Sequence, residues 1–297
     1  RQRPLDGAVL SIRESKIIGR ALGLKFSLER ASADTAQALA GEMARLQDEL
    51  GITYFVADAA ADVLVILADA ARDRDILLFN ISAPDDGLRA EACAANLMHI
   101  IPSRAMLADA MAQFLVARRW RDILLLQGEF PEDAAIADAF RASAQKYGLK
   151  IVGVRDFVIG NDPRDRDNNN IALLTTGLDY DAVFIADSLG QVGRYVPYQT
   201  ALPRPVIGSE GLVAAAWNWA WERHGAPQLN QRFERRIGRR MEDRDWAAWA
   251  AVKAIVEAVA RTGGGADFPT VTAYLKGPML ILDGYKGAAM SFRPWDN

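Results

Sequence analysis

The sequence has 297 residues, of which 51% are hydrophobic and 25% are charged, a composition that excludes disordered and fibrous folds. Its 35 basic and 38 acidic residues are interspersed and give a formal net charge of -3, so a nucleic acid or another phosphate-rich partner is not favoured. With one cysteine and two histidines, the chain can form no intrachain disulfide and lacks the usual ligands of a structural zinc site.

No run of residues approaches the roughly 20 apolar positions of a membrane-spanning helix. The first four residues are not a basic leader followed by an apolar run, so we expect that a signal peptide, if the protein has one, has been removed.

Helical and strand patterns alternate along the first two thirds of the chain. Helices are predicted at residues 5–23, at 34–50 with Asp34 and Gln37 as a capping pair and Gly51 as the stop, at 60–72, from a Ser103 cap to Leu115, and at 131–147 before Gly148. Short apolar runs predict strands at residues 52–57, 76–80, 123–127, 150–158, 182–187 and 205–208. Residues 81–91 are turn-rich, and the polar segment 159–170 is predicted to be a surface excursion.

Strands that are apolar throughout need cover on both faces, and the helices between them supply it. The pattern therefore predicts a doubly wound α/β architecture. Because about 200 residues of alternation exceed what one such sheet normally holds, we expect two α/β lobes. After residue 214 the pattern becomes mostly helical, with helices predicted at 214–223, 228–238, 243–262 and 269–276 and one or two short strands at 279–293.

Several segments resemble the type I periplasmic binding proteins of the branched-chain amino acid class. They are NISAPD (80–85), NLMHIIPS (96–103), GSEGL (208–212), WAAWAA (246–251), YLKG (274–277) and FRPWD (292–296). More narrowly, the runs PSRAMLADAMAQFLVARRWRDILLLQG, NQRFERRIGRRM and GAAMSFRPWD look like a subfamily associated with pyrroloquinoline quinone-dependent alcohol dehydrogenase systems. The family opens with a strand before its first helix, whereas this chain begins almost at that helix, so the strand is either missing or upstream of Arg1.

The resemblance implies two doubly wound α/β lobes joined by a three-crossing hinge, with residues 1–100 plus 217–276 in the N-terminal lobe and 101–216 plus 277–297 in the C-terminal lobe. It implies a periplasmic, monomeric solute-binding protein that is not an enzyme, with the membrane subunits of an ABC transporter as partners and a quinoprotein dehydrogenase as a further candidate. The expected ligand is pyrroloquinoline quinone, or a related aromatic carboxylate, bound in the cleft between the lobes, and no catalytic cofactor or metal is expected.

In α/β sheets the ligand site lies at the carboxyl ends of the strands, and by resemblance five such loops line the family's cleft. Pyrroloquinoline quinone is flat and carries three carboxylates, so its site should combine cationic donors with aromatic faces. The expected ligand-binding residues are Ala57, Asp58, Asn80, Ser82, Ala83, Asp85, Arg104, Gln127, Glu129, Phe130, Asp187, Ser188, Arg194, Glu210, Gly211, Trp217, Trp219 and Trp246. Trp217, Trp219 and Trp221 cannot all face one ligand from a helix, and packing in the core is an equal alternative for each tryptophan.

The acidic loop residues favour a different ligand. Asp85, Asp187 or Glu210 together with Ser82 would suit the ammonium and carboxylate of an amino acid, so an amino-acid binder or ligand sensor on the same scaffold stays open. An enzyme is disfavoured, because no nucleophile with its base and no metal cluster can be assigned. The basic run from Arg232 to Arg244 is interpreted as a solvated or transporter-facing surface, and Cys93 as a buried small hydrophobe.

Overall fold

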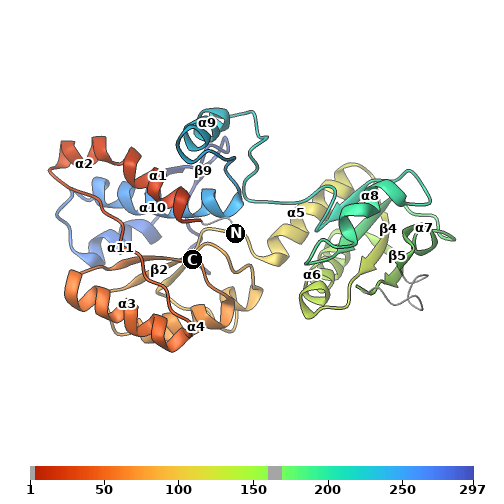
Figure 1. Ribbon diagram of the computed structural model, residues 1–297, viewed down its shortest axis with the longest axis horizontal. Coiled ribbons are helices and arrows are strands. Elements are labelled where there is room, and N and C mark those ends of the chain that lie inside the picture. Colours follow the sequence, from red (N-terminus) through yellow and green to blue (C-terminus); the bar gives the residue numbers. More distant parts are fainter. Residues whose placement is uncertain (1–3, 160–168) are drawn as a thin grey trace. The chain divides into compact units, whose positions relative to one another are not determined.

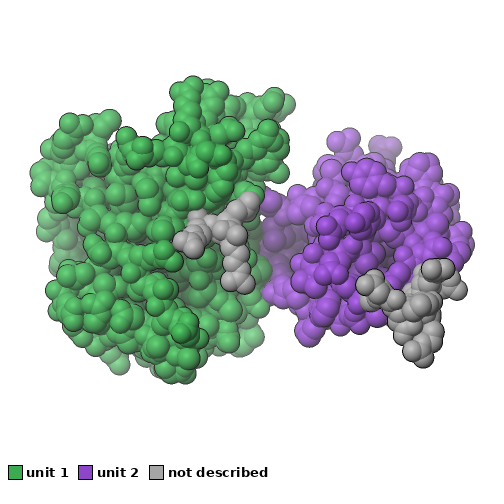
Figure 2. All heavy atoms as spheres, viewed as in Figure 1, with its two compact units in different colours: residues 1–102, 216–297 green, residues 103–215 purple. Residues whose placement is uncertain are grey.

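The computed structural model describes residues 4–159 and 169–297, so most of the predicted polar excursion at 159–170 lies outside the described residues. The chain forms two compact units, which Figure 2 distinguishes by colour. Unit 1 comprises residues 1–102 and 216–297, and unit 2 comprises residues 103–215. Each unit has its own parallel sheet with a hydrophobic core on each face, as the alternating pattern predicts.

The sheet of unit 1 has three parallel strands in the spatial order β1 (Tyr54–Ala57), β2 (Leu77–Asn80) and β3 (Leu97–His99). Leu77 and Phe79 face one core with α1 (Leu5–Glu14), α10 (Asp243–Arg261) and α11 (Phe268–Lys276). Leu78 faces a second core with α3 (Ala36–Leu50) and α4 (Ala61–Ala70). Figure 1 shows these two helical layers on either side of the sheet, which explains why β2 is apolar on both faces.

Helix α10 is the centre of the larger core. The backbone of α1 approaches it closely at Gly7, where a Cβ atom would lie 1.9 Å from the carbonyl oxygen of Asp245. Arg239 joins the two helices, because its guanidinium contacts the carboxylates of Asp6 at 2.8 Å and Asp245 at 2.6 Å. Any side chain larger than hydrogen at residue 7 would force α1 away from α10.

Unit 2 has a four-stranded parallel sheet in the spatial order β5 (Lys150–Asp156), β4 (Asp122–Gln127), β6 (Ala182–Ala186) and β7 (Val206–Gly208). Ile123 and Leu125 pack under α5 (Arg104–Ala117) and α6 (Pro131–Tyr147), where Phe140 stacks on Phe184 with ring centroids 3.8 Å apart. Leu124 and Leu126 face the opposite core. The shorter elements on that side are α7 (Ile171–Leu174), η4 (Gly193–Tyr195) and α8 (Val196–Gln199).

The remaining elements all belong to unit 1. They are α2 (Lys16–Leu22), η1 (Asp86–Arg89), α9 (Ala226–Ile237), β8 (Leu282–Asp283) and β9 (Ala289–Met290), the last two forming an antiparallel pair. None of the described helices is long and apolar enough to cross a membrane.

Three local predictions are wrong. Residues 214–223 form no helix, because Asp243 binds the backbone N–H of Trp217 and Asn218 binds that of Ala220 in an irregular segment. Helix α3 is capped by Thr35, whose hydroxyl accepts the Ala38 N–H, and not by Asp34. Cys93 is exposed, not buried, because it lies in the irregular segment between η1 and β3.

The C-terminal segment also differs from the prediction. Residues 277–297 lie in unit 1, whereas they were expected in the second lobe, and the unit boundaries fall at 102/103 and 215/216. Hydrogen bonds hold this segment in place, since the His99 N–H donates to the backbone oxygen of Asn297 and the Trp246 indole donates to that of Gly284. The segment that was expected to make a third connection therefore stays with the first unit.

Candidate functional site

The strand order of unit 2 places a candidate site at the ends of β4 and β6. From β4 the chain continues to β5 on one side of the sheet, and β6 and β7 lie on the other side. In open α/β sheets the crevice for a ligand forms at the carboxyl ends of the strands where this reversal occurs. Residues 128–130 follow β4 and residues 187–193 follow β6, so these two segments are the candidate site of unit 2.

Asp133 joins the two segments. It is fully buried, and its carboxylate accepts the N–H of Phe130 at 3.0 Å and the N–H of Ser188 at 2.6 Å. The N–H of Gly128 also donates to the carbonyl of Ala186, and a Cβ atom at Gly128 would lie 2.3 Å from the Asp133 carboxylate. Asp133 is not among the predicted site residues, although an acid at the third position of a helix is the signal of a capping box.

The carboxylate of Asp187 shapes the loop that follows β6. Its buried carboxylate accepts four backbone N–H groups, from Leu189, Gly190, Val192 and Gly193, at 2.7–3.2 Å. Four such bonds use the acceptor capacity of both oxygens. Asp187 therefore holds residues 187–193 in a fixed turn, and its contact with a ligand stays a prediction.

Arg104 and Glu132 form an ion pair beside these loops. The Arg104 Nη2 atom donates to both Glu132 oxygens at 2.7 and 2.8 Å, and Nε donates to Oε1 at 3.0 Å. The Arg104 side chain is 12% exposed and that of Glu132 is 47% exposed. This geometry holds a guanidinium in a fixed orientation next to the first turn of α6.

The other predicted residues of unit 2 have mixed environments. Gln127 accepts from Arg141 at 2.7 Å, and Glu129 accepts the N–H of Ile159 at 2.9 Å, so both side chains support the loops. Ser188, Gly211 and Phe130 are exposed, with Phe130 offering 36% of its surface at the start of α6. The half-buried Glu210 lies beside the 187–193 loop, and the exposed Arg194 donates to the carbonyl of Gly190 at 2.8 Å and lies over the Tyr195 ring.

In unit 1, Asn80 and Ser82 connect the loops after β1 and β2. Asn80 is fully buried, and its side chain accepts the N–H groups of Ser82 and Ala83 and donates to the Ala83 carbonyl. The Ser82 hydroxyl accepts the Ala59 N–H at 2.9 Å and donates to the Ala59 carbonyl at 3.0 Å. Asn80 and Ala83 are both buried and build the loop, and their contact with a ligand stays a prediction.

Two acidic side chains are accessible at these strand ends of unit 1. Asp58 is exposed and lies 3.7 Å from Arg244, and Asp85 and Ala57 are half-buried. Helix α4 starts immediately after this loop with Ala60 as its N-cap, which offers no side-chain acceptor for the first N–H groups of the helix.

His99 lies behind the unit 1 loop. Its Nδ1 atom is 3.0 Å from the Asn80 amide nitrogen, so Nδ1 acts as the acceptor. Burial, together with the positive charge of Arg89, lowers the pKa of His99 to about 4. A neutral imidazole therefore supports Asn80 at ordinary pH.

Two predicted ligand-binding tryptophans belong to the core instead. Trp217 and Trp246 are 5% and 1% exposed, and their rings stack with centroids 6.0 Å apart. The ammonium of Lys286 lies 4.0 Å from the Trp246 ring centroid, and burial lowers the pKa of this lysine to about 8. Trp219 is 44% exposed, but it lies 3.5 Å beneath the guanidinium of Arg240.

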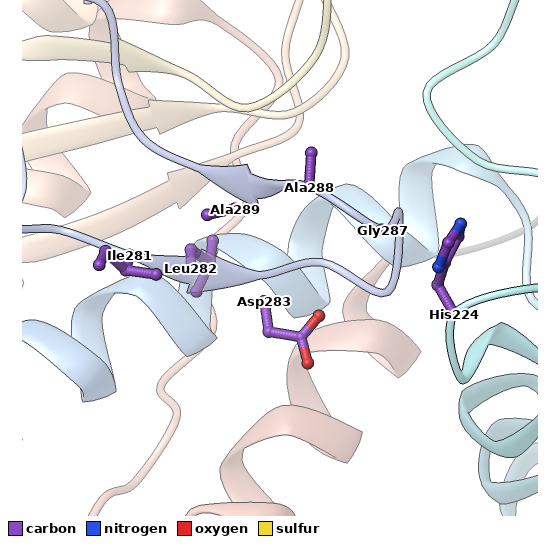
Figure 3. Close-up of a pocket in the computed structure, with 7 residues that line it drawn as sticks. All are labelled: His224, Ile281, Leu282, Asp283, Gly287, Ala288 and Ala289. Carbon is purple, nitrogen blue, oxygen red and sulfur yellow. The ribbon is translucent and has the colours of Figure 1, made fainter.

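Two surface pockets occur in the described part of unit 1, and no predicted ligand-binding residue lines either of them. One, of about 320 Å³, lies along β8 and β9, where Figure 3 shows the His224 ring facing Gly287. The other, of about 480 Å³, is lined by Cys93, Lys276, Arg293 and Trp295, among others. Within residues 4–159 and 169–297, no group of three or more His, Cys, Asp or Glu residues is arranged to hold a metal.

Solved structures show the same architecture. A branched-chain amino acid ABC transporter protein from Rhodospirillum rubrum, described as putative, is 15% identical with a TM-score of 0.76 over 97% of this chain and 88% of its own. An ABC transporter substrate-binding protein from Desulfitobacterium hafniense in complex with Leu is 16% identical with a TM-score of 0.75 over 99% and 89%. A solute-binding protein from R. palustris in complex with benzoate is 13% identical with a TM-score of 0.71 over 99% and 85%.

At these identities the likenesses show the fold, and they confirm the predicted α/β class with parallel sheets. No curated protein matches the sequence. A family model described as periplasmic binding protein matches residues 29–192, which is more than half of the 297 residues and includes the loops after β1, β2, β4 and β6. On this match, the chain belongs to the periplasmic binding protein family.

Proposed function

We propose that this protein is the periplasmic solute-binding protein of an ABC import system and that it binds a small aromatic carboxylate, with pyrroloquinoline quinone as the candidate of first choice. The observation that carries the proposal is the pair of strand-end loops in unit 2, which Asp133 fixes to one another before any ligand arrives. A loop that is already ordered loses little conformational entropy on binding, so it suits a protein whose activity is recognition.

Two side chains at these loops favour an aromatic carboxylate. Arg104 presents an oriented guanidinium, the group that binds a carboxylate through two parallel hydrogen bonds. Phe130 is the N-cap of α6, the helix that carries Glu132, and its partly exposed side chain can pack against a flat ligand. Structures with this fold are known in complex with benzoate and with 3,4-dihydroxybenzoic acid, which supports the same ligand class.

Pyrroloquinoline quinone extends this chemistry, since it is a fused aromatic system with three carboxylates. The membrane subunits of the transporter are the expected partners, and a quinoprotein dehydrogenase remains part of the proposal as a recipient. The burial of Trp217 and Trp246 changes which groups would bind the ligand, because the aromatic contact now falls to Phe130.

An amino acid is the second candidate. Asp58 and Asp85 in unit 1 and Glu210 in unit 2 are accessible carboxylates that could bind an ammonium group, and two structures of the same fold contain Leu and Ile. The Asp187 carboxylate already accepts four backbone N–H groups, so this alternative depends more on the other acidic residues.

Titration calorimetry of the purified chain with pyrroloquinoline quinone, benzoate and leucine separates the two candidates. We expect saturable binding of an aromatic carboxylate and none of leucine. The variant Phe130→Ala should weaken aromatic binding by about 1 kcal/mol, the contribution of one aromatic contact, while Tyr198→Ala on the exposed face of α8 should not. Binding of leucine alone would replace the first candidate with the second, and binding of none of the three would contradict both.

A further inference from the structure

The ion pair between Arg104 and Glu132 joins the first turns of two different helices at the proposed ligand-binding end of unit 2. Glu132 is the second residue of α6, which begins four residues after β4 ends, and Arg104 is the first residue of α5. Three hydrogen bonds of 2.7–3.0 Å connect the two side chains. The guanidinium therefore lies at the carboxyl end of the sheet, where the strand order reverses.

The two partners differ in how firmly they are held. The Arg104 side chain is 12% exposed, whereas the Glu132 side chain is 47% exposed. A half-exposed glutamate exchanges its partner for water at little cost, but a guanidinium that loses most of its water needs an anion beside it. Glu132 is thus the partner that can leave, and Arg104 is the partner that stays.

The dipole of helix α5 adds to this difference between Arg104 and Glu132. A cation at the N-terminus of a helix is opposed by the helix dipole, so the position of Arg104 is unfavourable unless an anion accompanies it. Asp133, the other acid in the first turn of α6, is buried, and its two oxygens accept the N–H groups of Phe130 and Ser188. Glu132 is left as the carboxylate that can move away from these loops.

We infer that Glu132 is a specificity-determining residue that occupies the carboxylate position on Arg104 until the carboxylate of a ligand replaces it. The inference rests on the proposed function and sharpens its ligand class. A ligand with a carboxylate in the plane of the guanidinium can replace Glu132, whereas an uncharged analogue cannot. A ligand carboxylate must therefore bind Arg104 more strongly than Glu132 does.

A residue that competes with the ligand can be told from one that contacts it, because replacing Glu132 should then tighten ligand binding and not weaken it. The variant Glu132→Gln removes the competing charge and keeps the shape of the side chain, so it should bind pyrroloquinoline quinone or benzoate about three- to tenfold more tightly than the unmodified chain. Benzamide, which has the same ring without the charge, should bind both proteins equally. The gain should disappear in Glu132→Gln combined with Arg104→Gln, which should bind no better than Arg104→Gln alone.

Asp138→Asn is the matched control, because Asp138 lies on the same helix, is exposed, and pairs with Arg141 at 2.6 Å. It should leave all affinities unchanged, and melting curves should confirm that every variant is folded. If carboxylates bind the unmodified chain but Glu132→Gln binds them equally or more weakly, the inference is overturned and the proposed function stands. If neither protein binds any of these probes, both are overturned.

Discussion

Buried polar side chains fix the loops at the strand ends of both units. Asp133 and Asp187 in unit 2 and Asn80 in unit 1 are each at most 2% exposed, and together they bind the backbone N–H groups of the loops after β2, β4 and β6. Each buried carboxylate or amide is stabilised because hydrogen bonds replace the water that it loses. The loop backbones are left as the surface that a ligand can meet.

The imidazole of His99 makes this support dependent on pH. Burial and the charge of Arg89 lower its pKa to about 4, and Asp296 opposes this shift only in part. Between pH 6.5 and 4 the unfolded chain binds the proton and the folded chain does not, so the free energy of unfolding falls as the pH falls through this range. A shift of this size corresponds to about 3 kcal/mol.

We therefore expect the unmodified chain to lose about 3 kcal/mol of stability between pH 6.5 and pH 4 relative to His99→Gln, as measured by urea unfolding across this range. His224→Asn, at the exposed histidine, is the control and should follow the unmodified chain. A parallel pH dependence of His99→Gln and the unmodified chain would show that His99 is not held neutral.

At the level of elements, the sequence predicts most helices and strands, because the residues that face a core are apolar and recur at the spacing of a helix or a strand. The range of α6, Pro131–Tyr147, equals its prediction, and α10 differs from its prediction by one residue. Residues 214–223 show where periodicity fails. Their tryptophans and alanines are helix-compatible, but tertiary bonds to Asp243 and Asn230 determine the backbone there.

The same tertiary contacts explain why Trp217 and Trp246 pack in the core, the alternative that the sequence left open. Trp217 enters the core at the point where the chain returns to unit 1, with its N–H on Asp243 and its ring on Trp246. Lys286 completes the cluster by donating to the carbonyl of Ala216 and covering the Trp246 ring. A sequence pattern cannot distinguish an aromatic residue in a binding site from one in this cluster, because the contacts that bury Trp217 and Trp246 come from residues far away in the sequence.

Lys286 makes the free energy of unfolding depend on pH in a second range. Burial lowers its pKa from 10.5 to about 8, an effect that the charge of Asp243 only partly offsets. Between pH 8 and 10.5 the unfolded chain holds the proton that the folded chain has released, so the free energy of unfolding rises with pH. Relative to Lys286→Met, the unmodified chain should gain up to about 3 kcal/mol over this range.

Chemical denaturation of both proteins from pH 7.5 to 10.5 measures this difference. Lys253→Met, which removes a lysine over the Trp249 ring of the same unit, is the control for the loss of one positive charge. A constant difference between Lys286→Met and the unmodified chain would mean that Lys286 is more hydrated than the cluster implies.

For the molecule as a whole, two α/β units could be predicted from the alternation of strands and helices, and the structure contains them. The position of residues 277–297 could not, because it depends on single hydrogen bonds such as that from His99 to Asn297. The candidate site is likewise predicted from the sequence only in part. The sequence identifies the loops at the strand ends, whereas only the structure shows that Asn80 and Asp187 are buried and support these loops. Phe130 and Arg104 stay predicted ligand contacts.

Amide hydrogen exchange with and without saturating pyrroloquinoline quinone tests the central claim, that the strand-end loops of this solute-binding protein hold its ligand. We expect ligand-dependent protection at residues 57–59, 80–85, 127–130 and 187–190, and unchanged exchange along β8 and β9 and around Cys93, where the two surface pockets lie. Protection confined to those pockets, or no protection at the strand-end loops by any ligand that binds, would contradict the account.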